Sequence, residues 1–370
     1  MTTGVPSIPE FAQAVLRAEE PYRTVGLVVG TEIAVLLGVS AAVLLWFVWK
    51  GFLELLRMAV ERRYGIYVME ASIERLHEDS PILRASLVSR AYLRGHLLSK
   101  ILRIGGPGRR SLADLYTRMG FLDRDAAGLS SMRWWQRVES CVAIGLAGRT
   151  EFAARVGPLL DDSREAVRIA AARALSRLEG AAAVPAIVAA MGQATEWGAA
   201  RMADMIAGCG AGAFEHVKAA VESSAEPVQR ARLIDILGAI GDTRAIPILL
   251  GLMKDADSEI RIRAAKALGV VPDRRSAVAL ARALGDDSWE VRAQAAKSLG
   301  RVGDPEMIEE LSGRLDDRNW WVRFNSAHAL AAMGEPGRSE LQRVVEQKSG
   351  FARDIAAQVL DMSAQGVLEQ

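Results

Sequence analysis

A phrase of fifteen residues recurs through much of the chain at a nearly fixed interval. Its clearest copy, residues 286–300, reads Asp-Asp-Ser-Trp-Glu-Val-Arg and then Ala-Gln-Ala-Ala-Lys-Ser-Leu-Gly. Its arginine, Arg292, lies 31 residues from both Arg261 and Arg323 (292 − 261 and 323 − 292). Steps of 30 to 32 residues reach the corresponding positions of the other copies, which are Arg137, Arg168, Ala199, Gln229 and Arg353. About eight units of this length predict a stacked array of repeats, because units of this size cannot close separate cores.

Each unit has the pattern of two helices joined by an acidic turn. Residues 245–253 form the first helix of one unit, and residues 260–268 form its second. In the next unit, Val291, Ala295 and Leu299 are spaced by four, so they share the buried side of the second helix. Alanine-rich texture and little alternation of apolar and polar residues predict an all-α chain without strands.

The turn aspartates and the recurring arginine are the polar signature of the repeat. We interpret the aspartates as caps of the second helix, where they would complement the positive end of its dipole. The arginine is placed to reach an aspartate of the adjacent unit, which predicts a ladder of ion pairs along the stack.

The pattern Asp-Asp-x-x-x-Val-Arg-x-x-Ala-x-x-x-Leu-Gly of residues 286–300 resembles the HEAT-like repeat of the phycobilisome lyase type. The resemblance extends over residues 133–362 and implies an α-solenoid that serves as a protein-binding scaffold. Some relatives act on bilin attachment, and distant helical-repeat proteins act on DNA. Units three and four depart from the pattern, since Ala199 and Gln229 replace the arginine. We expect an α-solenoid of about eight HEAT-like repeats over residues 131–364, plus one transmembrane helix.

The transmembrane helix is predicted at residues 25–49. This stretch is apolar except for Glu32, and as a helix it would be about 37 Å long, enough to cross a bilayer. A cleaved signal peptide fits less well, because the leader lacks a basic start. Glu32 either snorkels toward the outer headgroups or makes a polar contact with a second membrane helix.

Basic residues cluster after this span, at Lys50, Arg57, Arg62 and Arg63. By the positive-inside rule, the C-terminal side is cytoplasmic. We therefore expect a single-pass protein of the bacterial inner (cell) membrane, with residues 1–24 as an extracytoplasmic leader outside and the repeats in the cytoplasm.

Small residues spaced by four form one ridge along the span. They are Gly26, Gly30, Ala34, Gly38 and Ala42. Such a ridge allows the backbone of a second helix to approach closely, although small residues are also common background in membrane helices.

Residues 50–130 form a predicted juxtamembrane helical region. Two helices are expected over residues 52–102 with a break near Pro81, followed by a glycine-rich linker at 105–111 and a helix capped by Ser111. Residues 50–118 hold 13 basic and 7 acidic side chains. This surplus either attracts anionic lipid headgroups or is an ordinary solvated face.

The sequence shows no arrangement that suggests catalysis. The four histidines and two cysteines have no metal-ligand spacing, and the acidic pairs recur with the repeat, whereas a catalytic pair is built once. The 46 basic and 45 acidic side chains give a net charge of +1, so no overall field attracts nucleic acid. We expect no enzyme activity, no cofactor, no metal and no nucleic-acid partner.

Two surfaces are candidates for binding a protein. Six tryptophans stand at the start of second helices, namely Trp134, Trp135, Trp197, Trp289, Trp320 and Trp321. They form either a partner-binding edge or a packing contact with the neighbouring turn. The exposed face of the second helices carries Arg263, Lys266 and Lys297, which form either a solvated face or a groove for an acidic segment of a partner.

Two functional classes follow. The first is a membrane-anchored scaffold that recruits or regulates an integral membrane protein. One anchor combined with a HEAT-like array resembles accessory subunits of bacterial polysaccharide-synthesising glycosyltransferases, which implies a glycosyltransferase partner. The second is an enzyme of bilin-lyase or nucleobase type, which the predicted anchor and the missing acid/base cluster disfavour.

Overall fold

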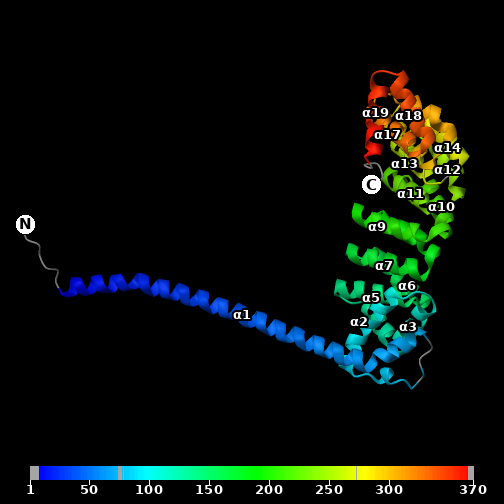
Figure 1. Ribbon diagram of the computed structural model, residues 1–370. Coiled ribbons are helices and arrows are strands. Elements are labelled where there is room, and N and C mark those ends of the chain that lie inside the picture. The colour runs from blue at the N-terminus through cyan, green and yellow to red at the C-terminus, as the bar shows by residue number, and fades with distance from the viewer. Residues whose placement is uncertain (1–7, 74–76, 78, 272, 366–370) are drawn as a thin grey trace, which may run out of the picture. The chain divides into compact units, whose positions relative to one another are not determined.

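The computed structural model describes residues 8–73, 77, 79–271 and 273–365, and it describes side-chain surroundings from residue 32 onward except at 364. The first seven residues of the predicted leader lie outside this range. The chain forms two compact units, residues 1–115 and 116–370. No strand occurs among the described residues, which confirms the all-α prediction (Figure 1).

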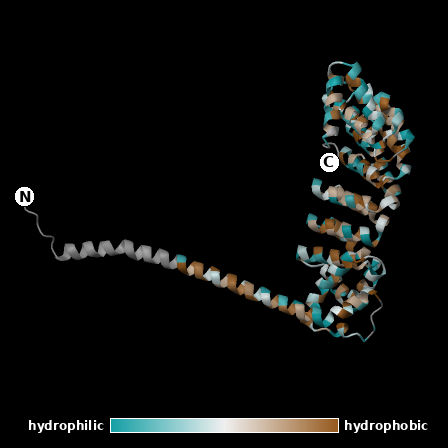
Figure 2. Ribbon diagram, viewed as in Figure 1, coloured by the Kyte–Doolittle hydropathy of each residue, from teal (hydrophilic) through white to brown (hydrophobic). Residues whose placement is uncertain are grey.

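The first unit begins with α1 (Ile8–Ile73), a single helix of 66 residues. The sequence divides this segment into leader, span and juxtamembrane helix, but the helix continues through both borders. Only Gly51 and Gly65 weaken it after the apolar run, and an isolated glycine costs a helix about 1 kcal/mol without ending it. Within the described residues, α1 from Glu32 onward is the one helix long and apolar enough to cross a membrane (Figure 2).

The C-terminal part of α1 packs against α2 (Leu87–Arg103). On α1 the buried residues include Tyr64 and Val68, and on α2 they include Leu93 and Leu97. The predicted break near Pro81 is present, because a short 3₁₀ turn, η1 (Pro81–Arg84), separates the two helices.

The predicted linker at residues 105–111 is wrong, because α3 (Gly106–Arg118) begins there. Pro107 lies in the first turn, where its missing N–H costs the helix nothing. A Cβ at Gly108 would lie 2.4 Å from the backbone oxygen of Ser72, so the glycine permits close packing. The Ser111 hydroxyl donates to the Pro107 carbonyl at 3.3 Å and does not cap the helix.

Over its described residues, the second unit is a stack of eight helix pairs in two layers. One layer holds the first helices of the pairs, which are α4 (Phe121–Gly128), α6 (Ala153–Val156), α8 (Val184–Met191), α10 (Phe214–Ser223), α12 (Ile246–Leu252), α14 (Arg274–Ala283), α16 (Ile308–Ser312) and α18 (Glu335–Gln347). Short 3₁₀ turns extend several of them, namely η2 (Thr150–Phe152), η3 (Gly157–Asp161), η4 (Gly180–Ala183), η5 (Gly210–Ala213), η6 (Thr243–Ala245) and η7 (Pro305–Met307).

The other layer holds the second helices, which are α5 (Trp134–Ala147), α7 (Glu165–Leu178), α9 (Glu196–Ala207), α11 (Pro227–Ile240), α13 (Ser258–Leu268), α15 (Trp289–Val302), α17 (Trp320–Ala332) and α19 (Phe351–Ala364). Each packs against the next along the stack. The predicted α-solenoid of about eight units is confirmed. The first pair begins at Phe121, ahead of the predicted start at residue 131.

Successive second helices approach closely because the repeat ends in glycine. A Cβ added at Gly300 would lie 2.8 Å from Cα of Ala329 in α17, and one added at Gly238 would lie 2.8 Å from Cβ of Ala267 in α13. The buried side is the predicted one, since Leu299 is fully buried. The glycine of the phrase therefore sets the spacing of the stack.

Candidate functional site

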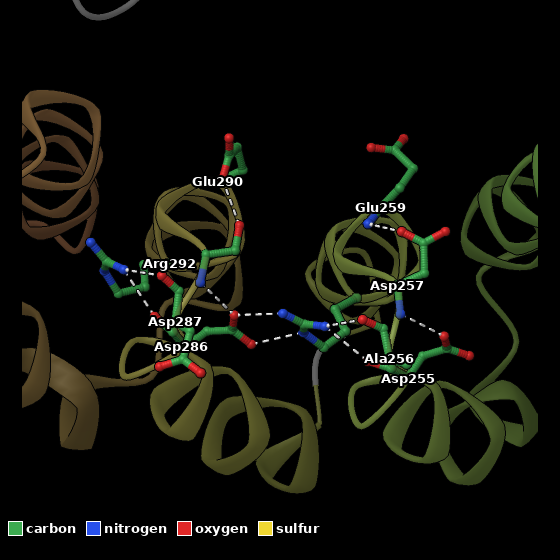
Figure 3. A network of polar contacts seen from close by, with 10 residues as sticks. Asp255, Ala256, Asp257, Glu259, Asp286, Asp287, Glu290 and Arg292 are labelled. Atoms are coloured by element: carbon green, nitrogen blue, oxygen red, sulfur yellow. Dashed lines mark hydrogen bonds and ion pairs between the residues drawn. The ribbon is translucent and has the colours of Figure 1, made fainter.

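A ladder of arginines and aspartates joins neighbouring pairs, as Figure 3 shows for its central part. Arg261 donates to Asp286 from Nε and Nη2 at 2.9 and 2.8 Å. Arg292 donates to Asp317 in the same two-pronged way, at 2.9 Å for both bonds. Arg137 does so to Asp162 at 2.7 and 2.9 Å. The predicted reach of the arginine into the next unit is confirmed at these positions.

The ladder has a further member that the sequence analysis missed. Arg230, 31 residues before Arg261, donates to Asp255 at 3.0 Å. The assignment of Gln229 to this position was wrong by one residue, and the Gln229 amide instead donates to the Val188 carbonyl at 3.3 Å. The sequence does contain a pattern that identifies Arg230, because an aspartate lies 25 residues after each paired arginine.

The predicted capping is confirmed at Asp257, which accepts the N–H of Glu259 at 2.9 Å at the start of α13, whereas the aspartates paired with arginine brace the turns instead. Asp286 accepts the N–H of Ser288 at 2.9 Å, ahead of the first turn of α15, and it also accepts from Arg261. Asp317 accepts the N–H of Asn319 at 2.8 Å. Burial raises the pKa of the Asp317 carboxyl, but the hydrogen bonds from Arg292 and Asn319 outweigh burial, so this pKa lies below its ordinary value.

The ladder is interrupted where the next unit lacks an aspartate. Toward the next unit, Arg168 donates to the Gln193 carbonyl at 3.4 Å. Within its own unit it donates to the Asp162 carbonyl at 3.0 Å and lies 4.0 Å from Glu165, and its Nε has no hydrogen-bond partner among the described residues. Arg323 has Lys348 at the corresponding position, and its guanidinium carbon lies 4.4 Å from the centre of the Phe351 ring. At Arg168 and Arg323, therefore, no arginine–aspartate pair within the described residues joins the unit to the next one.

The six predicted tryptophans all lie in the first turns of α5, α9, α15 and α17. Their exposure ranges from 38% for Trp289 to 64% for Trp197, so the side chains face solvent. Two further apolar residues, Val228 and Phe351, occupy the equivalent first turns of α11 and α19 and are 56% and 63% exposed. We call this row of eight residues the aromatic edge.

On α17 the aromatic edge continues along the helix. The Trp320 and Trp321 rings meet edge to face at 4.8 Å, and Trp320 stacks on Phe324 at 5.0 Å. Phe324 in turn lies 6.1 Å from the His328 ring. Phe324 was not among the predicted binding residues, although its spacing of four from Trp320 places both on one side of the helix.

The three predicted basic residues have different surroundings. Arg263 pairs with Asp235 at 2.7 Å and with Glu259 at 2.6 Å, and Lys266 pairs with Asp235 at 2.8 Å. These two cations are therefore neutralised within the chain. Lys297 forms no ion pair among the described residues.

Lys297 lines a hollow of about 370 Å³ between α15 and α17. Arg301 lies one turn further along α15 and is likewise without an ion pair in the described part of the chain. The opposite wall is made by Phe324, Asn325 and His328 of α17. The hollow thus has one cationic wall and one aromatic wall, and it adjoins the aromatic edge at Trp320.

The predicted membrane ridge lies on α1. Ala34 and Ala42 are exposed, and a Cβ added at Gly38 would have no atom within 4 Å. Gly26 and Gly30 lie in α1 but outside the residues whose side-chain surroundings are described. Within this unit the ridge is free to meet another helix over its described part.

Residues 32–365, apart from the gaps given above, hold no cluster of three histidines, cysteines or acids suited to a metal ion. Both cysteines are free, and Cys141 is buried. Burial raises the pKa of the Cys141 thiol to about 12, so the thiol is protonated at neutral pH.

Comparison with known proteins identifies the repeat. The model for HEAT repeats matches residues 214–288 and 276–361, and the model for the PBS lyase HEAT-like repeat matches residues 167–193. No curated protein matches the sequence.

Several solved structures are similar at low identity. A Kap121p mutant is 13% identical over 80% of this chain and 39% of its own, with a TM-score of 0.46, so the chain spans about two fifths of that protein. The CpcE–CpcF complex of phycocyanin lyase from Nostoc sp. is 19% identical over 51% of this chain and 99% of the matched chain, with a TM-score of 0.29. Human deoxyhypusine hydroxylase is 16% identical over 84% and 98%, also with a TM-score of 0.29.

Proposed function

The chain is a HEAT-like repeat protein, and we propose that it is a membrane-anchored scaffold that binds and recruits or regulates an integral membrane protein. In this proposal α1 crosses the bacterial inner membrane once, with its N-terminus outside, and the repeat array binds its partner in the cytoplasm. The scaffold has no catalytic activity of its own.

The aromatic edge is the observation that carries the proposal. Apolar side chains exposed singly are normal, but here eight gather in the equivalent first turns of six second helices, with α7 and α13 contributing none. Tryptophan is enriched among the residues that dominate binding energy, because it buries a large rigid surface and can still donate one hydrogen bond. A row of this kind supports a protein partner that covers several repeats at once.

The hollow between α15 and α17 extends this contact surface. Lys297 and Arg301 carry charge that the described chain does not neutralise, whereas Arg263 and Lys266 share Asp235. Carboxylates of a partner would find complementary charge beside Trp320 and Phe324. The predicted acidic-segment groove is therefore proposed at Lys297, and Arg263 and Lys266 are assigned to contacts within the array.

The anchor supports a partner in the same membrane. The small residues of α1 would allow a helix of that partner to approach within the bilayer. The resemblance to accessory subunits of polysaccharide-synthesising glycosyltransferases leads us to propose a glycosyltransferase as the partner. The basic surplus after the span would add contact with anionic lipid headgroups.

Affinity purification of the full-length protein in mild detergent tests this proposal. Trp320→Ala with Trp321→Ala should lower recovery of an integral membrane protein at least tenfold, since a binding hot spot contributes about 2 kcal/mol or more. Gly30→Leu with Gly38→Leu should reduce recovery of the same protein by blocking helix approach. Val270→Ala is the matched control, because Val270 is 48% exposed but lies outside the aromatic edge.

Both double variants should keep the helical content of the wild type. If both recover the partner as well as the wild type does, the proposed contact surfaces are wrong. If no integral membrane protein is recovered with the wild-type chain, the scaffold proposal itself fails.

A further inference from the structure

A second hollow lies in the layer of first helices, between α12 and α14. Its volume is about 730 Å³, roughly twice that of the hollow beside Lys297. Its residues come from the first helices and the turns that follow them, so it includes no member of the aromatic edge. It is a separate surface on the same array.

The floor of this groove is apolar. Leu250 and Met253 line it from α12 and its C-terminal end, and Val278 lines it from α14 and is 38% exposed. Small residues keep it open, because Gly251 and Ala279 stand where longer side chains would fill the space. A Cβ added at Gly251 would have no atom within 4 Å.

The rim of the groove is basic, and part of its charge is not neutralised. Arg274 pairs with Glu306 at 2.8 Å, and Arg275 pairs with Asp273 at 3.0 Å. Lys254, after α12, and Arg282, on α14, line the groove without any ion pair among the described residues.

No carboxylate in the described part of the chain lies within ion-pair distance of Lys254 or Arg282. Among the described residues that line the groove, Asp286 is the one acidic residue. Both of its carboxylate oxygens accept hydrogen bonds from Arg261. The groove therefore presents two uncompensated cations beside an apolar floor.

We propose that the groove between α12 and α14 binds an acidic amphipathic helix of a partner protein. The apolar floor would take the hydrophobic face of that helix, and Lys254 and Arg282 would meet carboxylates on its flanks. Lining residues recur on successive turns of α14 from Arg274 to Ala283, a rise of about 14 Å. That length suits two to three turns of a docked helix.

This inference rests on the proposed scaffold function and extends it. The aromatic edge and the groove are formed by different helices, so two partners can bind one array at the same time. The protein then acts as a bridge that holds a second, acidic partner beside the membrane protein.

Selection from a displayed library of 16-residue helical peptides tests the inference with full-length protein in lipid nanodiscs. Enriched peptides should carry leucine or phenylalanine at helical spacings of three and four, flanked by glutamate or aspartate. Fluorescence anisotropy then measures the dissociation constant of the best peptide. Gly251→Phe should fill the groove without strain in α12 and weaken binding at least tenfold.

Charge reversal gives a second, independent variant. Lys254→Glu with Arg282→Glu should also weaken binding at least tenfold, and the wild-type affinity should fall as salt is added. Lys218→Glu with Arg232→Glu makes the same change in net charge outside the groove and should leave the dissociation constant within twofold. Circular dichroism confirms that each variant keeps its helices.

The proposal is overturned if the enriched peptides are neutral or basic, if no peptide is enriched, or if the best peptide binds Gly251→Phe as tightly as wild type. Trp320→Ala with Trp321→Ala separates the two proposals. This variant should bind the peptide normally even though it loses the membrane partner, so either result can fail without the other.

Discussion

Replacing Asp317 with asparagine would leave the Arg292 guanidinium without its charged partner inside the stack. The two side chains are 6% and 7% exposed and share two hydrogen bonds of 2.9 Å. Arg292 would keep its bonds to the carbonyls of Asp286 and Asp287, at 2.9 and 3.1 Å, but no carboxylate would accept a hydrogen bond from it.

The expected loss follows from this burial. Removing one member of a buried ion pair typically costs about 3–5 kcal/mol, because the remaining charge is desolvated and uncompensated. Asparagine retains one acceptor oxygen, so we expect the lower end, about 3 kcal/mol. This loss of free energy should destabilise the interface between α15 and α17, because the ion pair joins these two repeats.

Hydrogen exchange of the full-length protein measures this interface directly. Amides of α17 that exchange through opening of the interface should exchange on the order of 10²-fold faster, at about 1.4 kcal/mol for each tenfold change. Amides of α5 and α7, at the other end of the array, should be unchanged, because repeats interact with their neighbours only.

Glu306→Gln is the matched control. Arg274 and Glu306 meet at 2.8 Å, yet they are 75% and 60% exposed, so their separation is worth less than about 1 kcal/mol. If Asp317→Asn and Glu306→Gln change local exchange by the same small factor, the reasoning that the ladder couples neighbouring repeats is refuted.

Three further predictions concern the stack. Leu299→Ala should lower the free energy of unfolding by about 2–5 kcal/mol in urea titrations, because it empties a fully buried position, and an unchanged midpoint would contradict that packing. Gly300→Ala should destabilise the array, since its Cβ would collide with α17, whereas Gly251→Ala should be neutral or stabilising; thermal melts that rank the two in the opposite order would contradict the close approach. The pKa values of Asp286 and Asp317 are lowered in the folded state, so their stabilisation is complete above about pH 4 and is lost as the pH falls through the folded values; urea midpoints that do not fall between pH 5 and pH 3 would contradict this.

The repeat architecture was predictable because one period governs all of the helix pairs. A unit of this size must bury its apolar face against its neighbours, so spacing alone implies a stack. The register of the repeat was harder to assign in units three and four, where the sequence departs from the repeated phrase. Because Gln229 was placed at the arginine position, Arg230 was not recognised as a member of the ladder. The same error of one residue left Asp235, which neutralises Arg263 and Lys266, unassigned to the exposed face.

Helix boundaries near glycine and proline were also difficult to predict from the sequence. Residues 105–111 have the composition of a linker, but Pro107 is well suited to a first turn and Gly108 is required by the nearby Ser72 carbonyl. That second requirement is a tertiary contact, which local propensity cannot reveal.

Protease protection shows on which side of the membrane the repeat array lies. Protease added to intact spheroplasts should leave residues 131–364 uncut, whereas the same protease added to inverted membrane vesicles should digest the loops between the helix pairs. Cleavage within the array in intact spheroplasts would place the array outside the cytoplasm, and recovery of the full-length chain in the soluble fraction after lysis would rule out a membrane anchor.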